Sequence, residues 1–173
     1  EMANPEAWRG RIVLRIGASD FHTRVFVNGL EVGQHRGGYA AFGFDIQHAL
    51  QLGRNHITIR VEDSLSWTQP RGKQAGTTRW PIDYDGVTGI WQSVWLEPLP
   101  TVSIESTSYA YEVDKQSLHY KVFLSEHVDG EVSLEILDGD GVVASDTVQT
   151  SGRAEVRTTL AIATPKLWSL EQP

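Results

Sequence analysis

The sequence predicts an all-β protein built as two tandem antiparallel β-sandwiches, and three observations lead to this prediction. Several short runs alternate apolar with polar residues, which is the period of two expected of half-buried strands. Turn signals rich in Gly, Asn, Asp and Pro separate these runs at intervals of roughly 10 residues. No run has the period of an amphipathic helix.

The first hundred residues contain three strand signals. Residues 11–16, RIVLRI, alternate apolar with basic positions. Asn28 and Gly29 lie between the two halves of residues 24–32, RVFVNGLEV, and predict a hairpin because both residues tolerate the positive φ angles of a primed turn. Residues 55–63, NHITIRVED, alternate again. We therefore expect a strand, a hairpin and a further strand in this order.

The alternation stops between Trp67 and Gly89. This segment, WTQPRGKQAGTTRWPIDYDGVTG, combines Gly and Pro with aromatic and charged side chains. Long loops of this composition are usually functional or disordered. Residues 83–100, DYDGVTGIWQSVWLEPLP, then predict the last strand of the first sandwich and a hinge to the second, with Trp91 and Trp95 buried on one face and Asp83 to Asp85 on the rim.

Composition changes at about Pro100, which predicts a domain boundary there. Residues 1–100 carry ten Lys or Arg and ten Asp or Glu, whereas residues 101–173 carry five and twelve and so account for the whole net charge of −7. The second part repeats the strand signals, in residues 117–126, 130–143 and 154–162, with a turn at Asp138 to Gly141. We expect the domains to be 1–100 and 101–173.

Several functions are disfavoured by the composition. The negative charge argues against a nucleic-acid partner, and no apolar run is long enough for a membrane span, so we expect a soluble chain whose compartment stays open. The chain has no cysteine, and its six histidines lack the spacing of a metal site. Residues 36–43, RGGYAAFG, lack the Lys and Ser or Thr of a phosphate loop. We predict no metal and no cofactor.

Four motifs occur in an order that resembles a known family: VNGLEVGQHRGGYAAFGFDI, GRNHITIRVED, TQPRGKQ and TGIWQSVWLEPLP. Together they resemble the sugar-binding jelly-roll domain of glycoside hydrolase family 2, the β-galactosidase, β-glucuronidase and β-mannosidase group. Residues 101–173, which end in PKLWSLEQP, are similar to the immunoglobulin-like domain that follows in that family. The resemblance implies a parent enzyme that hydrolyses O-glycosidic bonds in carbohydrate metabolism.

The resemblance also implies strands before residue 1 and after residue 173, and a catalytic (β/α)8 barrel of about 250 residues. We therefore expect an internal piece of a longer enzyme, with truncated sandwiches at both ends. Open sheet edges would invite pairing with another chain, so homo-oligomers are expected. The family's acid/base Glu follows an Asn, and no Asn-Glu dipeptide occurs here. We predict no catalytic residue in this chain.

Carbohydrate binding is the chemistry that the loop can support, because sugar rings stack on flat aromatics while amides and charged groups bond the hydroxyls. The residues that suit such a site are Trp67, Arg71, Lys73, Gln74, Trp80, Asp83, Tyr84 and Asp85. Gln69 and Trp91 lie close to them in the sequence. Core or interdomain packing of the tryptophans, and turn capping by the two aspartates, are the structural alternatives.

Three functions stay open at this point. We favour a non-catalytic part of a family 2 glycosidase, which acts as a scaffold and substrate-pocket wall for the barrel. The first alternative is a free-standing carbohydrate-binding module that uses the loop over residues 67–91. The second is a β-sandwich interaction protein with no affinity for glycans.

Overall fold

The computed structural model describes residues 10–64, 66–75 and 80–171. The chain divides into two compact units, Glu1–Pro100 and Thr101–Pro173. Among the described residues all regular structure is β-strand except for two short 3-10 helices, η2 (Gln47–Ala49) and η3 (Val113–Lys115). The sheets pair antiparallel throughout, so the predicted all-β class is confirmed.

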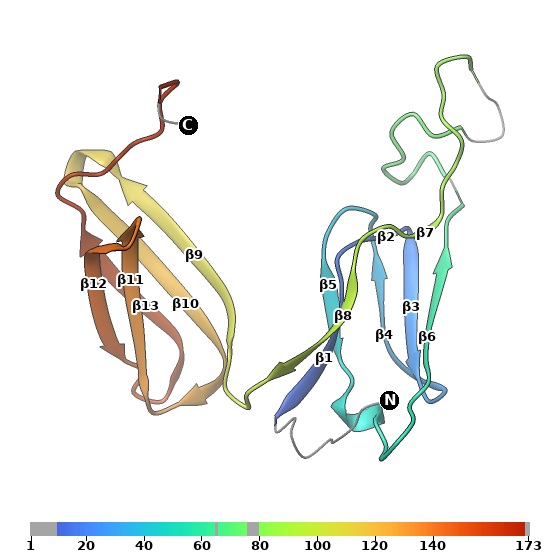
Figure 1. Cartoon of the computed structure of the whole chain (residues 1–173), viewed down its shortest axis with the longest axis horizontal. Helices are drawn as coiled ribbons and strands as arrows, with labels where there is room; N and C mark the ends of the chain where they lie inside the picture. Colours follow the sequence, from blue (N-terminus) through green and yellow to red (C-terminus); the bar gives the residue numbers. More distant parts are fainter. Residues whose placement is uncertain (1–9, 65, 76–79, 172–173) are drawn as a thin grey trace. The chain divides into compact units, whose positions relative to one another are not determined.

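Unit 1 is built from two three-stranded sheets and one two-stranded ribbon (Figure 1). The first sheet has the order β5 (Phe42–Asp45), β1 (Arg11–Ile16), β8 (Val94–Leu99). The second has the order β4 (Leu30–Arg36), β3 (His22–Val27), β6 (Ile57–Glu62). The ribbon pairs β2 (Ser19–Asp20) with β7 (Gly89–Ile90). The central strands β1 and β3 thus belong to different sheets.

The core of unit 1 lies between these two sheets. Every second residue of β1 and β3 points inward, because side chains alternate across a strand, and these residues form one buried cluster with Ile46. The cluster consists of Ile12, Leu14, Ile16, Val25, Val27 and Ile46. The arrangement is that of a β-sandwich whose inner faces are apolar.

The hairpin predicted at Asn28 and Gly29 is confirmed. The two residues have φ angles of 51° and 86° and connect β3 to β4. The Asn28 side chain also donates to the Ala49 carbonyl at 2.9 Å and accepts the His56 amide at 2.9 Å. Asparagine therefore provides both the left-handed backbone and a polar link to neighbouring turns.

Unit 2 contains the remaining five strands, and it includes the strands predicted over residues 117–126, 130–143 and 154–162. One sheet has the order β13 (Arg153–Ala161), β10 (Ser117–Val128), β9 (Ile104–Glu112). The other pairs β11 (Glu131–Asp138) with β12 (Gly141–Gln149). Its buried apolar residues come from β10 and β13, and they are Leu118, Val122, Leu124, Val156 and Leu160.

The expectation for Trp91 and Trp95 is wrong. They do not share one strand, because the chain breaks its pairing between β7 and β8 and Trp91 lies in the gap. They are also 53% and 44% exposed. Trp95 lies in β8, which pairs only with β1 among the described strands. Trp91 is held at the edge of its ring by a 2.7 Å hydrogen bond from Nε1 to the Gly38 carbonyl, which leaves the rest of the ring uncovered.

Candidate functional site

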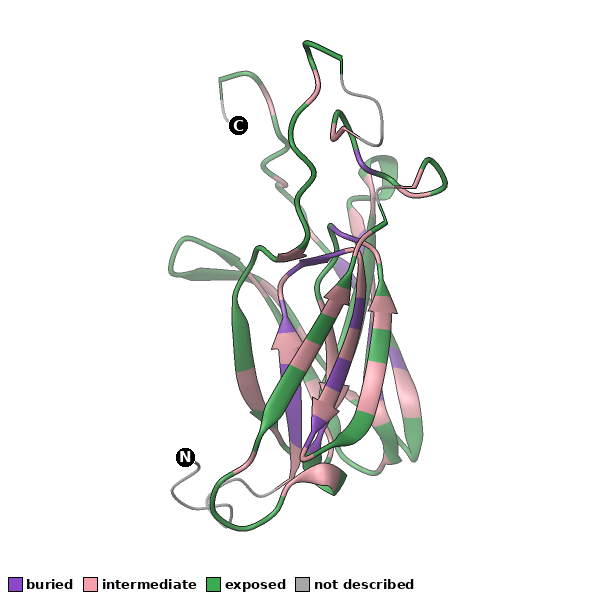
Figure 2. Cartoon of the chain, turned by 90° about the vertical axis from the view of Figure 1, so that its right-hand side faces the viewer, coloured by how far each residue is buried: buried purple, intermediate pink, exposed green. Residues whose placement is uncertain are grey.

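The long loop between β6 and β7, residues 63–88, lies at one end of the sandwich of unit 1 (Figure 1). Most of its described residues are exposed (Figure 2). All eight residues predicted to contact sugar belong to this loop, and all are described: Trp67, Arg71, Lys73, Gln74, Trp80, Asp83, Tyr84 and Asp85. The structure divides them into residues that build the loop and residues that face outward.

Gln74 joins the two sides of the loop. Its backbone lies opposite Tyr84 in a parallel bridge, which is flanked by a 2.9 Å bond from the Tyr84 amide to the Lys73 carbonyl. Its side-chain oxygen accepts the Val87 amide at 2.7 Å. Its side-chain nitrogen reaches the Asp20 carboxylate of β2 at 3.5 Å. One glutamine therefore contacts both halves of the loop and the sandwich below it.

Arg71 is a buried residue of the loop, with 8% of its surface exposed. Its guanidinium lies 3.6 Å from the centre of the Trp67 ring, and Nη1 donates to the Gln74 carbonyl at 2.9 Å. A cation over an aromatic face is attracted by the ring quadrupole. The guanidinium thus joins Trp67, which is 89% exposed, to the backbone of Gln74.

Trp80 and Asp83 form a tight turn. The Asp83 carboxylate accepts the Trp80 amide at 2.7 Å, and the Asp83 amide donates to the Trp80 carbonyl at 3.0 Å. Capping of a turn by an aspartate is a common local role for this residue. The turn holds the Trp80 ring outward with 69% of its surface exposed, and Tyr84 beside it in the sequence is 65% exposed.

The outward face of the loop therefore combines aromatic rings with charged groups. Its aromatic members are Trp67, Trp80 and Tyr84, and Lys73 and Asp85 are exposed polar residues of the same loop. Trp91 and Tyr39 meet edge to face near the foot of the loop, with ring centroids 6.2 Å apart. Flat rings beside hydrogen-bonding groups can stack a sugar ring and bind its hydroxyls.

Asp20 is a buried residue of this region that is absent from the site predicted from the sequence. It is 6% exposed, and Gly38 lies so close that a Cβ there would approach the Asp20 Oδ1 to 2.7 Å. Burial raises the pKa of Asp20, the bond from Gln74 lowers it, and the charge of Asp63 raises it further. No motif surrounds Asp20 in the sequence, and its partner Gln74 is 54 residues away.

A hollow of about 410 Å³ opens at the base of the loop. It lies where β3 begins and where β4 and β6 end, and its polar lining includes His22, Arg36, Glu62 and Gln69. The Gln69 side chain donates to Asp63, which fixes this wall of the hollow to the end of β6. The hollow extends the polar surface from the loop toward the sandwich.

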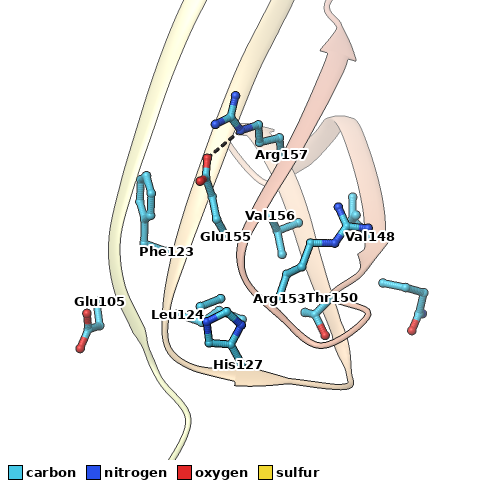
Figure 3. A pocket seen from close by; sticks show the side chains of 12 residues that line it. Glu105, Phe123, Leu124, His127, Val148, Thr150, Arg153, Glu155, Val156 and Arg157 are labelled. Carbon is cyan, nitrogen blue, oxygen red and sulfur yellow. Dashed lines mark hydrogen bonds and ion pairs between the residues drawn. The ribbon is translucent and has the colours of Figure 1, made fainter.

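Unit 2 has a separate hollow of about 620 Å³ (Figure 3). It opens where the pairing of β10 with β13 is interrupted, between Phe123 and Val128. Arg153 and His127 line it, and Arg157 is paired with Glu155 at 2.6 Å. The His127 ring contacts the Gly152 carbonyl at 3.0 Å, so the ring is held by the backbone of the β12 to β13 turn.

Two further searches cover only the described part of the chain. No group of three or more His, Cys, Asp or Glu side chains is arranged to hold a metal ion there. No helix in the same residues is long and apolar enough to cross a membrane.

The fold and the loop define a class, namely β-sandwich proteins that present an aromatic and polar loop at one end of the sandwich. The family model described as "Glycosyl hydrolases family 2, sugar binding domain" matches residues 1–100. The chain therefore belongs to the glycoside hydrolase family 2 sugar-binding domain family, and the resemblance predicted from the four motifs is confirmed.

The curated relatives include β-glucuronidases from animals and bacteria. The human β-glucuronidase is 28% identical over 179 residues, which cover 90% of this chain and 28% of the human protein. The β-glucuronidase of Paenibacillus borealis is 31% identical over 180 residues, which cover 95% of this chain and 29% of the bacterial protein. The chain thus spans less than a third of the length of these relatives.

Solved structures show the same fold. A β-glucuronidase from Ruminococcus gnavus, in complex with a C6-substituted uronic isofagomine, matches 96% of this chain with a TM-score of 0.72 and 24% identity, over 29% of its own length. A family 2 glycosyl hydrolase from Bacteroides cellulosilyticus matches the same share with a TM-score of 0.69 and 24% identity, over 23% of its own length.

Proposed function

We propose that this chain is the non-catalytic part of a β-glucuronidase-like glycosidase, in which unit 1 supports the substrate pocket and the loop over residues 63–88 contributes to its wall. The observation that carries the proposal is the composition of the exposed surface of the loop, to which Trp67, Trp80 and Tyr84 contribute rings and Lys73 and Asp85 contribute charged groups. The family and the curated relatives support the same function.

The proposal assigns different roles to the eight residues of the loop. Trp80 and Tyr84 offer ring faces, and Asp83 keeps the turn that presents Trp80. Lys73 and Asp85 are exposed polar residues of the kind that bind the carboxylate and hydroxyl groups of a glucuronoside. Arg71 and Gln74 act through the loop itself, because their polar groups contact Trp67, Val87 and Asp20. Hydrolysis belongs to a barrel that this chain would support.

The first experiment is to sequence the gene that encodes this chain and to determine how far its reading frame extends. A frame that continues into a (β/α)8 barrel, which needs about 250 residues in total, supports the proposal. In the protein from that frame, Asp83→Ala should lower kcat/KM for 4-nitrophenyl β-D-glucuronide by about tenfold, as expected for the loss of a positioning contact worth roughly 1 kcal/mol or more. An unchanged kcat/KM, or a stop codon directly after Pro173, would contradict it.

A second candidate is a free-standing carbohydrate-binding module, which the high exposure of the loop aromatics favours. The test is a titration of intrinsic tryptophan fluorescence of the 173-residue chain with D-glucuronic acid, with D-glucose as the neutral comparison. A saturable change that is lost in Trp80→Ala supports the module. Trp168→Ala is the matched control, because Trp168 is 72% exposed but lies in unit 2. A flat response contradicts binding by the chain alone.

A further inference from the structure

Among the described residues, the side chain of Gln74 connects the loop over residues 63–88 to the sandwich. Gln74 is the residue that contacts most of its parts, since it bonds the Val87 amide, bridges to Tyr84 and receives the Arg71 guanidinium at its carbonyl. The side-chain nitrogen of Gln74 points the other way, to the Asp20 carboxylate in β2. Gln74 and Asp20, which are 54 residues apart in the sequence, therefore form a side-chain contact between the loop and the sandwich.

Asp20 is an unusual partner for this contact because it is almost fully buried. It lies in the ribbon of β2 and β7, opposite Gly89, so its backbone is fixed where the loop returns to the sheet. Its Oδ1 has no hydrogen-bond partner among the described residues and faces Gly38, where only a glycine leaves room. A buried carboxylate oxygen costs free energy unless it is bonded, so a residue without a positional role would be expected to be apolar here.

We propose that Asp20 is a positioning residue, which holds Gln74 and through it sets the place of Trp80, Asp83 and Tyr84 at the candidate sugar surface. The role at a sugar surface rests on the proposed function, but the contact between Asp20 and Gln74 can be tested without any sugar. The 3.5 Å separation of Asp20 and Gln74 makes the pair a long hydrogen bond, and the short 2.7 Å bond to Val87 carries the effect onward.

The charged groups around Asp20 make the contact sensitive to added charge. The charge of Asp63, which follows β6, raises the pKa of Asp20, and the Gln69 side chain donates to Asp63. Gly89 of β7 lies opposite Asp20, and Gly38 in the segment after β4 approaches its Oδ1. A further carboxylate at position 74 would face Asp20, on which the charge of Asp63 already acts.

The test is amide hydrogen exchange measured by NMR on the 173-residue chain. In Gln74→Met the amides of Tyr84 and Val87 should exchange about three- to tenfold faster, because the variant removes the side-chain hydrogen bonds of Gln74. The amides of Val25 and Val27 in the core report whether the fold is intact. Gln149→Met is the matched control, since the Gln149 side chain bonds the Glu131 carboxylate at 3.2 Å in unit 2.

Three variants separate a positioning role from a merely structural one. Asp20→Asn keeps an acceptor oxygen for Gln74 and should retain the protection of Tyr84 and Val87, whereas Asp20→Ala should lose it. In Gln74→Glu the new carboxylate lies against that of Asp20, so the protection should fall at neutral pH and recover in acid, where protonation removes the repulsion. If Asp20→Ala fails to fold, the pH dependence of Gln74→Glu still decides the question, because the repulsion in that variant involves the Asp20 carboxylate.

Unchanged protection factors in a folded Asp20→Ala variant, or a pH-independent loss in Gln74→Glu, would overturn the inference. The proposed function fails in a different way, through an unchanged kcat/KM in the longer protein or a stop codon after residue 173, while the amides of Tyr84 and Val87 still depend on position 74. The two failures are therefore distinguishable.

Discussion

The sandwich of unit 1 and the loop that joins β6 to β7 differ in what covers their side chains. Ile16, Val25 and Val27 are 0% exposed between two sheets. Trp67 and Trp80, which are larger, are 89% and 69% exposed. The sandwich is held by apolar burial and ladder hydrogen bonds, whereas the loop is held by a few polar contacts at Arg71, Gln74 and Asp20.

This difference shows how one unit can be stable and still present an aromatic surface. Burying an apolar side chain stabilises a fold by about 1.5–3 kcal/mol, and an exposed ring contributes little to it. The rings of the loop are therefore available for contacts with a ligand or another part of an enzyme. The polar contacts fix their position without covering them.

The largest change in unfolding free energy is expected for Leu14→Ala in the core. Leu14 is 2% exposed in the cluster of β1 and β3, so the variant should lose about 2–5 kcal/mol of unfolding free energy through lost burial and the cavity left behind. Urea denaturation followed by circular dichroism measures this loss. Leu52→Ala is the control, because Leu52 is 86% exposed and its loss should change the free energy by about 0.5 kcal/mol or less.

A smaller effect is expected at the junction of the two regions, in Asp20→Asn. Burial raises the pKa of Asp20, so the folded chain binds a proton at this carboxyl more tightly than the unfolded chain does. The ionised carboxylate therefore costs stability at neutral pH, and this cost disappears as the pH falls through the raised pKa toward the ordinary value for Asp.

The variant should thus be more stable than the wild type at neutral pH, and its advantage should shrink in acid. Denaturation curves at several pH values measure the difference. Asp45→Asn gives the comparison, because Asp45 is a surface partner of Arg11 at 3.2 Å. An advantage of Asp20→Asn that stays constant with pH would contradict the assigned cause.

The smallest effect is expected for Trp67→Ala in the loop. Since Trp67 is 89% exposed, the unfolding free energy should change by about 0.5 kcal/mol or less, although the Arg71 guanidinium loses its aromatic partner. The same denaturation assay measures it, with Trp67→Phe as the variant that keeps a ring over Arg71. A loss comparable with that of Leu14→Ala would remove the distinction between sandwich and loop.

Much of the fold could be predicted from the sequence because strands and tight turns are local. Residues 11–16 alternate in the sequence and form β1, and Asn28 with Gly29 forms the expected turn. The sequence also predicts the loop over residues 67–89, since its composition differs from that of the strands around it. The four motifs added the family, which the family model supports over residues 1–100.

The division of labour within the loop could not be predicted. Arg71 and Gln74 have the composition of sugar ligands, but the structure commits their polar groups to Trp67, Val87 and Asp20. Trp91 and Trp95 are predicted to be buried on one face, but the structure leaves both half exposed. Exposure depends on which strands flank a residue in space, and the pattern of one segment does not contain that information.

The sequence by itself determined the all-β class, the strands of both units, the turn at Asn28 and the presence of an aromatic loop, because period, turn chemistry and composition are properties of neighbouring residues. Only the tertiary structure decided which residues of that loop face outward and which hold it in place. The contact between Asp20 and Gln74 joins residues 54 positions apart, and such a pair forms only when the sheets bring β2 and the loop together.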